Sequence, residues 1–421
     1  MKRIFNLICI AALFAGCAKN ITEIQSDKQD FQSNQSEGSR NVEEVRSIAL
    51  TAMEDFFPEQ TKAGDKLIES VTPFHGLTKS SSSDNTLFYI VNFENNEGFV
   101  LVGANTAAPE VIACVDKGNY DGGITPVDGF NMYIEDISAQ LESISVSRID
   151  IPTDPTGYIT KPNDASTVVN PLVSVSWHQR EPFNWYCPVI AGETTPTGCV
   201  ATSIAQIMSV YESPTSISLT YSNAHASNIA LDWANMKDSQ HASFHNTTCQ
   251  YCIQNAALLR EIGERVDMDY DIDGSGAYSS KVKNGILSFG YACDNYTGYS
   301  FNSVFSSIKL NRPVYIDAAK ADNSSAHAWV VDGNRYIRDE DLIYEVSSTS
   351  SKYVGKAGRE DYYLHFNYGW GGTSDGYYIA RRHEYGKGPT VYGGEYDNYP
   401  ITMFTGTYTR NVGVITNIRP N

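Results

Sequence analysis

The most informative segment of this 421-residue chain is residues 196–214, PTGCVATSIAQIMSVYESP. After Cys199, apolar residues recur at helical spacing, and Pro214 ends the pattern. Cys199 is therefore predicted to open a helix. The free N–H groups and positive dipole end of a helix N-terminus stabilise a thiolate, which makes such a sulfur nucleophilic near neutral pH. Most cysteines are inert core residues, so the spacing alone leaves a structural Cys199 as the alternative.

Two downstream segments supply candidate partners for Cys199. His327 lies in SSAHAWVVDG, 128 residues after Cys199, and its alanine neighbours leave room around the imidazole. A Cys followed by a His at about this separation is the chain order of papain-like enzymes, although eight histidines make a coincidence easy.

Asn367 lies in LHFNYGWGGTSDGYYIA, which predicts two strands joined by a Gly-rich turn. Its amide could accept the second N–H of His327 and fix the tautomer, with Trp370 shielding that bond from water. A plain hairpin with glycines at positive φ is the alternative.

An upstream segment supplies a candidate hydrogen-bond donor. The sequence WHQREPFN, residues 177–184, places Gln179 20 residues before Cys199. A neutral amide there suits an oxyanion hole completed by the backbone N–H of Cys199, and loss of one such donor costs about 3 kcal/mol of transition-state stabilisation. A surface glutamine without a catalytic role is the alternative.

The length of the chain fits two domains that each bury a core. Residues 41–148 predict a small α+β domain, in which a helix precedes the hairpin TLFYIVNF and GFVLVGA. Residues 149–172 contain four prolines and show no sustained period, which predicts an exposed linker and the region most open to proteolytic processing. Residues 173–421 are the predicted second domain. The Gly- and Tyr-rich residues 381–400 predict a long loop that could border its cleft; an inert surface loop is the alternative.

The N-terminus predicts export. Residues 1–17 combine two basic residues, an apolar run and the string LFAGC ending at Cys17, which is typical of a bacterial lipoprotein signal with an acylated cysteine. The apolar run is too short to span a bilayer comfortably. An ordinary cleavable signal with a chance cysteine is the alternative. Residues 18–40, rich in Ser, Gln and Asn, predict a flexible stalk, so we expect a membrane-anchored lipoprotein that is periplasmic or displayed on the cell surface and is released if processing removes the anchor.

The composition excludes one class of partner. A formal net charge of -18 argues against binding to the phosphate backbone of a nucleic acid, which needs clustered Lys and Arg. The 41% hydrophobic and 12% aromatic residues are typical of a folded globular chain.

Taken together, the four motifs resemble the streptopain family of papain-like bacterial cysteine proteases. They are WHQREPFN, TGCVATSIAQIMSVYESP, AHAWVVDG and FNYGWGGTSDGYY, and they occur in the family's order over most of residues 173–380. The resemblance implies an α+β papain-like catalytic domain with Cys199 as nucleophile, His327 as general base, Gln179 in the oxyanion hole and Asn367 orienting the histidine. It places Trp370 in the same site.

The resemblance also implies that residues 41–148 are an inhibitory prodomain, so that the chain is a zymogen and its own prodomain an intramolecular inhibitor. Family members favour a bulky apolar side chain at the second substrate residue before the cut, and Met268 and Ser275 are candidates for lining that pocket. The chain has Tyr368 after Asn367 where streptopain has Trp, and a shorter segment between Gln179 and Cys199, which puts the subsite preferences in doubt.

The remaining cysteines leave several pairings open. With Cys17 acylated and Cys199 free, the catalytic domain retains four cysteines that permit three pairings in an oxidising compartment, namely Cys187, Cys249, Cys252 and Cys293. Cys114 is expected to stay unpaired. A zinc cluster of His241, His245, Cys249 and Cys252 is disfavoured, because side chains on one continuous helix face cannot surround a tetrahedral ion.

We therefore predict a secreted, lipid-anchored cysteine endopeptidase that hydrolyses peptide bonds in protein or peptide substrates through an acyl-enzyme. The reaction needs neither a metal nor an organic cofactor. One alternative is a catalytically silent lipoprotein that binds peptide or glycan through its tyrosines. Another keeps the Cys-His chemistry but transfers the acyl group to an amine.

Overall fold

The computed structural model describes residues 38–59, 66–76, 85–144, 157–221, 228–238, 249–320, 325–389, 391, 394–404 and 409–421. The predicted signal peptide, Cys17 and nearly all of the predicted stalk lie outside these ranges, as do His241 and His245. Within them, no helix is both long and apolar enough to cross a bilayer. Arg40, the last residue of the predicted stalk, is buried and donates to the Gly103 carbonyl over 2.8 Å, so it packs with the sheet.

The N-terminal part of the described chain is a four-stranded antiparallel sheet with two helices. Helix α1 (Val42–Phe56) begins at Asn41, whose side chain accepts the N–H of Glu44, and packs its apolar face on β3 and β4. The predicted hairpin is present, with Asn95 at φ 60° in its turn. The elements are, in chain order, α1, β1 (Ile68–Phe74), β2 (Phe88–Phe93), the 3₁₀ turn η1 (Glu94–Asn96), β3 (Phe99–Gly103), β4 (Val111–Val115) and α2 (Asp128–Ser143).

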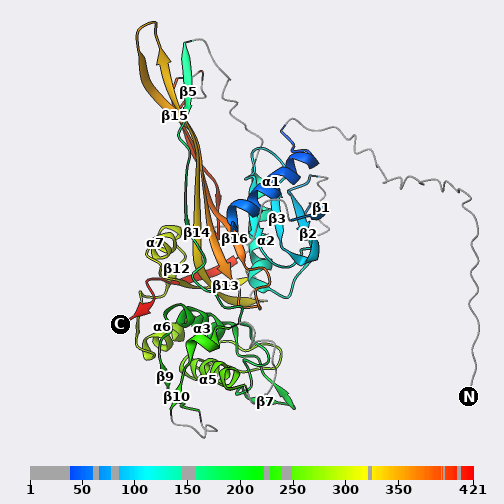
Figure 1. Cartoon of the computed structure of the whole chain (residues 1–421), viewed down its shortest axis with the longest axis vertical. Helices are drawn as coiled ribbons and strands as arrows, with labels where there is room; N and C mark the ends of the chain where they lie inside the picture. The colour runs from blue at the N-terminus through cyan, green and yellow to red at the C-terminus, as the bar shows by residue number, and fades with distance from the viewer. Residues whose placement is uncertain are drawn as a thin grey trace, which may run out of the picture. The chain divides into compact units, whose positions relative to one another are not determined.

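The C-terminal part separates into a helical region and a sheet (Figure 1). The helices are α3 (Cys199–Tyr211), α4 (Trp233–Met236), α5 (Gln250–Arg265), α6 (Ser279–Ser288) and α7 (Phe301–Lys309). The main strands are β13 (Val314–Lys320), β14 (Ala326–Val346), β15 (Ser351–Asn367), β16 (Gly376–Lys387), β17 (Tyr396–Thr402) and β18 (Thr409–Ile415). The short strands are β7 (Val189–Ile190), β8 (Glu193–Thr194), β9 (Ser216–Ile217), β10 (Ile229–Ala230), β11 (Tyr291–Ala292), β12 (Thr297–Gly298) and β19 (Arg419–Pro420).

One continuous sheet joins the two parts of the chain. Its strand order is β1-β2-β3-β4-β16-β15-β14-β13-β18-β12, and the junction is the antiparallel pairing of β4 with β16, where Cys114 faces Tyr377. A single hydrophobic core runs across that junction, since apolar side chains of α1, α2 and β2–β4 pack with Trp329, Phe366 and Tyr378. A second core lies under α3, α5 and α6 on the other face of β13 and β14. The fold is the predicted α+β type.

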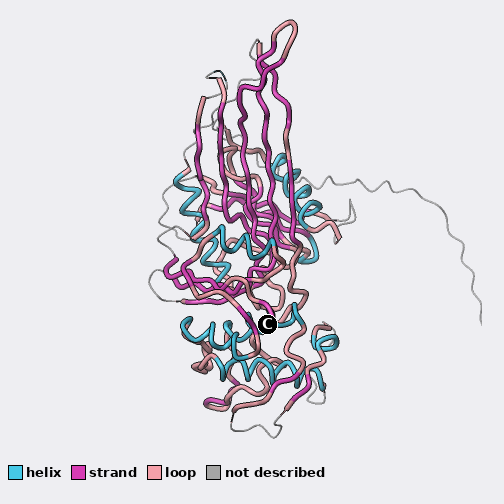
Figure 2. The backbone as a smooth tube through the Cα atoms, turned by 90° about the vertical axis from the view of Figure 1, so that its left-hand side faces the viewer, coloured by secondary structure: helices cyan, strands magenta, loops and turns pink. Residues whose placement is uncertain are grey.

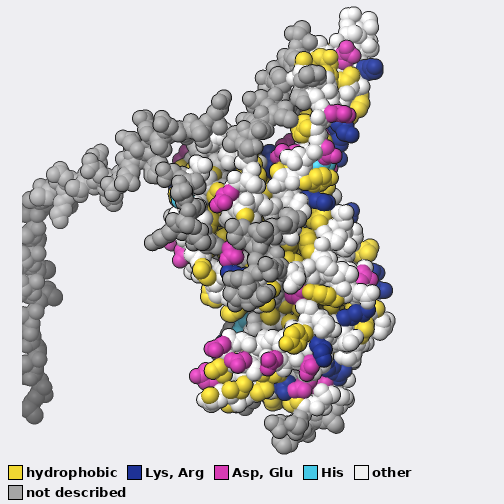
Figure 3. Space-filling view, turned by 180° about the vertical axis from the view of Figure 1, so that it is seen from behind, with side chains coloured by type: hydrophobic (Ala, Val, Ile, Leu, Met, Phe, Trp, Pro, Cys, Tyr) yellow, Lys and Arg dark blue, Asp and Glu magenta, His cyan; other side chains and the backbone are white. Residues whose placement is uncertain are grey.

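Strands β14 and β15 form a hairpin much longer than the rest of the sheet. Figure 2 shows its strands running together to one projecting end, while most of the helices gather at the other. Lys, Arg, Asp and Glu side chains are interspersed along this projecting end (Figure 3). The prediction of a long loop at residues 381–400 is wrong at both ends, because β16 extends to Lys387 and β17 begins at Tyr396 and pairs with β16.

The sequence predicts an irregular linker over residues 149–172, and the structure differs for its second half. Residues Tyr158–Pro162 (β5) and Ala165–Val169 (β6) both pair antiparallel with β14. Their side chains are mostly exposed, so the segment lacks the alternation of apolar and polar residues from which strands are predicted.

Candidate active site

Cys199 is the first residue of α3, as the helical period predicts. Gly198 precedes it with φ 84° and ψ 142°, a conformation that favours glycine. A Cβ at Gly198 would lie 2.7 Å from the Met268 sulfur and 2.9 Å from the Ser275 carbonyl oxygen. The glycine is therefore required twice, by its backbone angles and by this close approach, and it fixes the direction in which the Cys199 side chain leaves the helix.

Burial is the main influence on the pKa of the Cys199 thiol. Burial raises its pKa from 9.0 to about 11, and this outweighs hydrogen bonding from the Ala328 backbone, which favours the thiolate. The helix N-terminus alone does not offset the loss of solvation. Since Ala328 follows His327 on β14, the strand that carries the candidate base already touches the candidate nucleophile.

His327 is buried and lies against the N-terminal part of the chain. Its Nε2–H donates to the Tyr368 carbonyl oxygen over 3.0 Å. A Cβ on Gly129, in the first turn of α2, would lie 3.0 Å from His327 Cδ2 and 2.7 Å from the Tyr368 ring. Burial lowers the pKa of His327 below 6.5, so the imidazole is neutral at pH 7. Among the hydrogen bonds of the described residues, none joins His327 to Cys199 or to Asn367.

Asn367 ends β15 and is held by neighbours other than His327. Its Oδ1 accepts the side-chain N–H of Gln206 over 2.7 Å and the backbone N–H of Gly369 over 3.1 Å. Its Nδ2 donates to the Val175 carbonyl over 3.3 Å. Gln206 is on α3, two turns beyond Cys199, so Asn367 joins α3 to the sheet. Its predicted role as the orienting partner of His327 stays a prediction.

Gln179 and Trp370 lie on loops beside the start of α3. The Gln179 carbonyl accepts the N–H of Thr197 over 3.0 Å, which brings the loop carrying Gln179 next to the residues before Cys199. Trp370 is partly buried in the Gly-rich turn, and its indole N–H has no hydrogen-bond partner in the described structure. The N–H of Gly371 donates to the Trp177 carbonyl over 3.2 Å, so this turn and the Gln179 loop are joined.

Met268 and Ser275, the candidates for the pocket of the second substrate residue before the cut, both lie beside Gly198. Besides the close approach to Gly198, the hydroxyl of Ser275 donates to the Pro196 carbonyl over 2.7 Å. Met268 is partly buried against the helical core. These two residues therefore flank the segment that leads into Cys199, on the side of the helical region.

Two residues of the site had no recognisable signal in the sequence. Tyr368 holds His327 through its backbone carbonyl, a group that every residue carries. Asp375 accepts the backbone N–H of that same Tyr368 over 2.8 Å, and burial raises the pKa of its carboxyl to about 7. An aspartate among glycines predicts an ordinary turn residue, so this buried carboxyl could not be found from its neighbours in the chain.

The structure contains one of the disulfides that the sequence left open. Cys249 and Cys252 form a disulfide at the start of α5, and Cys187 and Cys293 are free. Cys114 is free and fully buried in β4, in agreement with the prediction. The disulfide leaves neither of its sulfurs as a thiolate ligand, and within the described ranges no group of three or more His, Cys, Asp or Glu side chains is arranged to hold a metal ion.

Comparisons with known proteins identify two regions of the chain. A model of the Peptidase C10 family matches residues 177–378, and a model described as Spi protease inhibitor matches residues 39–141. The chain is 25% identical over 410 residues to the thiol protease/hemagglutinin PrtT of Porphyromonas gingivalis, covering 89% of this chain but only 41% of PrtT. It is 26% identical over 381 residues to streptopain of Streptococcus pyogenes, covering 81% of this chain and 84% of streptopain.

A solved structure shares the fold. A prointerpain A fragment from Prevotella intermedia superposes with a TM-score of 0.50 at 20% identity, covering 83% of this chain and 98% of the fragment. The peptidase match begins at Trp177, before α3, and ends within β16, so it contains Cys199, His327 and Asn367. Residues 177–378 are therefore a peptidase region of the Peptidase C10 family of streptopain-like cysteine peptidases, and residues 39–141, ahead of it, are an inhibitory prodomain of the Spi type.

Proposed function

We propose that this chain is the precursor of an exported cysteine endopeptidase in which Cys199 attacks the peptide bond and His327 is the general base. The observation that supports this most directly is that Cys199 opens α3 while the backbone of Ala328, next to His327, contacts its sulfur. The nucleophile and the base therefore come from two elements that the fold already brings together. Protein and peptide substrates follow from this chemistry, which needs neither a metal nor an organic cofactor.

In the proposed reaction the imidazole of His327 takes the proton of the Cys199 thiol, and the thiolate attacks the substrate carbonyl. The oxyanion is held by the Gln179 side chain and the Cys199 backbone N–H. His327 then protonates the leaving amine and activates the water that hydrolyses the acyl-enzyme. Asn367 orients the imidazole and Trp370 excludes water from that contact, while Met268 and Ser275 line the pocket for the second residue before the cut.

The prodomain keeps this pair apart in the proposed precursor. The first turn of α2 leaves no space beside His327 and Tyr368, where even a methyl group on Gly129 would collide. With the imidazole bonded to a backbone carbonyl, Cys199 stays a neutral thiol of raised pKa. Removal of α2 frees the imidazole to turn to the sulfur, and the resulting ion pair lowers the thiol pKa.

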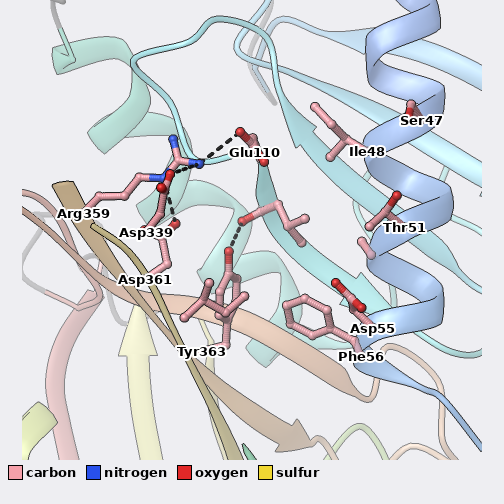
Figure 4. Close-up of a pocket in the computed structure, with 13 residues that line it drawn as sticks. Ser47, Ile48, Thr51, Asp55, Phe56, Glu110, Asp339, Arg359, Asp361 and Tyr363 are labelled. Carbon is pink, nitrogen blue, oxygen red and sulfur yellow. Dashed lines mark hydrogen bonds and ion pairs between the residues drawn. The ribbon is translucent and has the colours of Figure 1, made fainter. Parts of the chain in front are cut away.

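Contacts between β15 and the prodomain, away from His327, also support an inhibitory role for the prodomain. Arg359 on β15 forms an ion pair with Glu110 over 3.0 Å, and the hydroxyl of Tyr363 donates to the Val111 carbonyl over 2.9 Å. These side chains line a pocket of about 300 Å³ between α1 and the long hairpin (Figure 4). None of the proposed catalytic residues lines it, so we assign it to the prodomain interface rather than to substrate binding.

Anchoring and processing complete the proposal. Acylation at Cys17 would hold the precursor on a membrane facing the periplasm or the exterior, and a cut in residues 149–172 would separate residues 41–148 from the catalytic region 173–421. The string LFAGC ending at Cys17 supports the acylation, and the exposed residues of the linker support the cut. Growth with an alkyne-labelled fatty acid tests the first step, since the label should be lost in Cys17→Ala.

The decisive experiment compares the precursor lacking residues 1–17 with its Cys199→Ala variant. Both are incubated with reductant and a thiol-alkylating peptide probe and then analysed by mass spectrometry. Loss of an N-terminal piece and labelling of Cys199, in the wild type only, are the expected results. If removal of the prodomain by an added protease still left Cys199 unlabelled, the silent binding protein would replace the enzyme. Addition of a primary amine separates hydrolysis from acyl transfer by the mass of the product.

A further inference from the structure

The segment that leads into the catalytic region follows β14 in one unbroken register. Tyr158 faces Glu345 at one end and Val169 faces Asn334 at the other, so β5 and β6 are two halves of one antiparallel strand. The chain stays on β14 beyond β6, because the N–H groups of Leu172 and Val173 donate to the backbone and side chain of Asp332 over 3.0 and 2.9 Å.

The interruption between β5 and β6 is held by side chains. The amide of Asn163 donates to the Glu340 carboxylate, and the Glu340 backbone N–H donates to Asp164 Oδ1 over 3.1 Å. The N–H of Asn163 donates to the Glu340 carbonyl over 2.7 Å, and Arg338 Nε donates to the Asn163 carbonyl over 3.0 Å. Asn163 and Asp164 are therefore both hydrogen-bonded to β14.

The two ends of the segment are packed as well. Tyr158 packs against a small apolar cluster formed by Ile343 and Ala357 near the end of the hairpin. At the other end the chain comes so close to β14 that a Cβ on Gly333 would lie 2.9 Å from the Val169 carbonyl oxygen. These contacts are made with β14 and β15, which belong to the catalytic region rather than to the prodomain.

Without this segment, the projecting part of β14 would expose a long row of unpaired N–H and C=O groups. Such an edge pairs readily with other chains and is a site of aggregation. The segment is suited to be the final edge, because it carries Lys161 and Pro162, a charge and a residue without an N–H. Lys161 Nζ lies over the Tyr344 ring, 4.7 Å from its centroid.

We infer that residues 158–173 remain with the catalytic region after activation as a built-in edge strand of β14, and that the activating cut falls before Tyr158. This inference narrows the processing region proposed above. Its statement about the position of the cut rests on the proposal that the chain is a zymogen. A protease needs an extended substrate free of other pairing, and the described residues from Tyr158 to Val169 are already paired. The mature enzyme therefore starts with a strand that was expected to be discarded linker.

Limited digestion of the Cys199→Ala precursor with thermolysin tests the strand without depending on the activity of the chain. Thermolysin cuts before large apolar residues, and Ile159 and Val168 are suitable, with side chains 40% and 50% exposed. We expect no cut between Tyr158 and Val169 while α2 is intact. A cut there with the prodomain still folded would overturn the inference.

A variant pair tests what protects the strand. Asn163→Ala with Asp164→Ala removes the side-chain hydrogen bonds of the junction, and cutting within 158–169 should rise about tenfold, since proteolysis follows the open population. Ser166→Ala with Thr167→Ala changes exposed side chains of the same strand and should leave the rate unchanged. Equal rates in the two variants would overturn the assignment. In self-processed wild type, a mature N-terminus before Tyr158 supports the inference, and one after Val169 refutes it.

Discussion

Alkylation of Cys199 in the intact precursor should titrate with a midpoint near pH 11, because burial raises the pKa of its thiol from 9.0 to about 11. A shift of two pH units corresponds to about 3 kcal/mol between the protonated and ionised forms. At pH 7 about one thiol in 10,000 is then a thiolate, against about one in 100 for an unshifted thiol. The precursor is therefore protected by its protonation state as well as by the presence of the prodomain.

The assay is the rate of iodoacetamide labelling of the Cys199 peptide, followed by mass spectrometry from pH 6 to pH 11.5 in the precursor lacking residues 1–17. Restricted access lowers the rate at every pH but does not move the midpoint, so the midpoint reports ionisation alone. Cys199→Ser identifies the signal. Cys293, a half-buried free cysteine on the surface of the helical region, serves as a reference in the same sample.

Removal of the prodomain should move the Cys199 midpoint far to the acid side, because His327 can then form an imidazolium–thiolate pair with it. The midpoint of Cys293 should stay where it was. A Cys199 midpoint below pH 8 in the intact precursor would refute the reasoning, since it would show that the thiolate is already stabilised while α2 is in place.

Three further predictions concern single substitutions. Burial raises the pKa of Asp375 from 3.8 to about 7, so the folded state binds its proton more tightly and loses stability as the pH rises through that interval. Asp375→Asn should therefore raise the free energy of unfolding by up to about 4 kcal/mol at pH 8 and by less at pH 5. The check is the gain in melting temperature at the two pH values, and an equal gain at both would contradict this account. Gly129→Ala places a methyl group 3.0 Å from His327 Cδ2, and this overpacking should destabilise the contact between α2 and His327 by about 1–3 kcal/mol. Self-processing, followed on a gel time course, should then be roughly tenfold faster. Glu142→Ala, on the exposed face of the same helix, should leave the rate unchanged. Gly198→Ala should lower kcat/KM of the processed enzyme about a hundredfold with an unchanged circular dichroism spectrum, because the new Cβ would displace the residue before the nucleophile, and retention of full activity would exclude that requirement.

Local patterns determined several parts of this molecule from the sequence alone. The helical period after Cys199 predicts α3, because a helix buries one stripe of side chains whatever it packs against. The hairpin of β2 and β3 follows equally from two β-rich runs joined by a polar turn. The motifs around Gln179, His327 and Asn367 indicated the family. These features depend on residues that are close to one another in the chain, so they can be predicted from the sequence.

Long-range pairing was decided only by the tertiary structure. The strand formed by β5 and β6 pairs with a partner more than 160 residues away and exposes most of its side chains, so neither periodicity nor composition marks it. The bond between His327 and the Tyr368 carbonyl uses a group common to every residue. The pKa values of Cys199 and Asp375 depend on burial, which the assembled fold creates from distant segments. The sequence indicated which residues are candidates for the chemistry, whereas the packing of distant segments decided that His327 bonds to the Tyr368 carbonyl and not to Cys199.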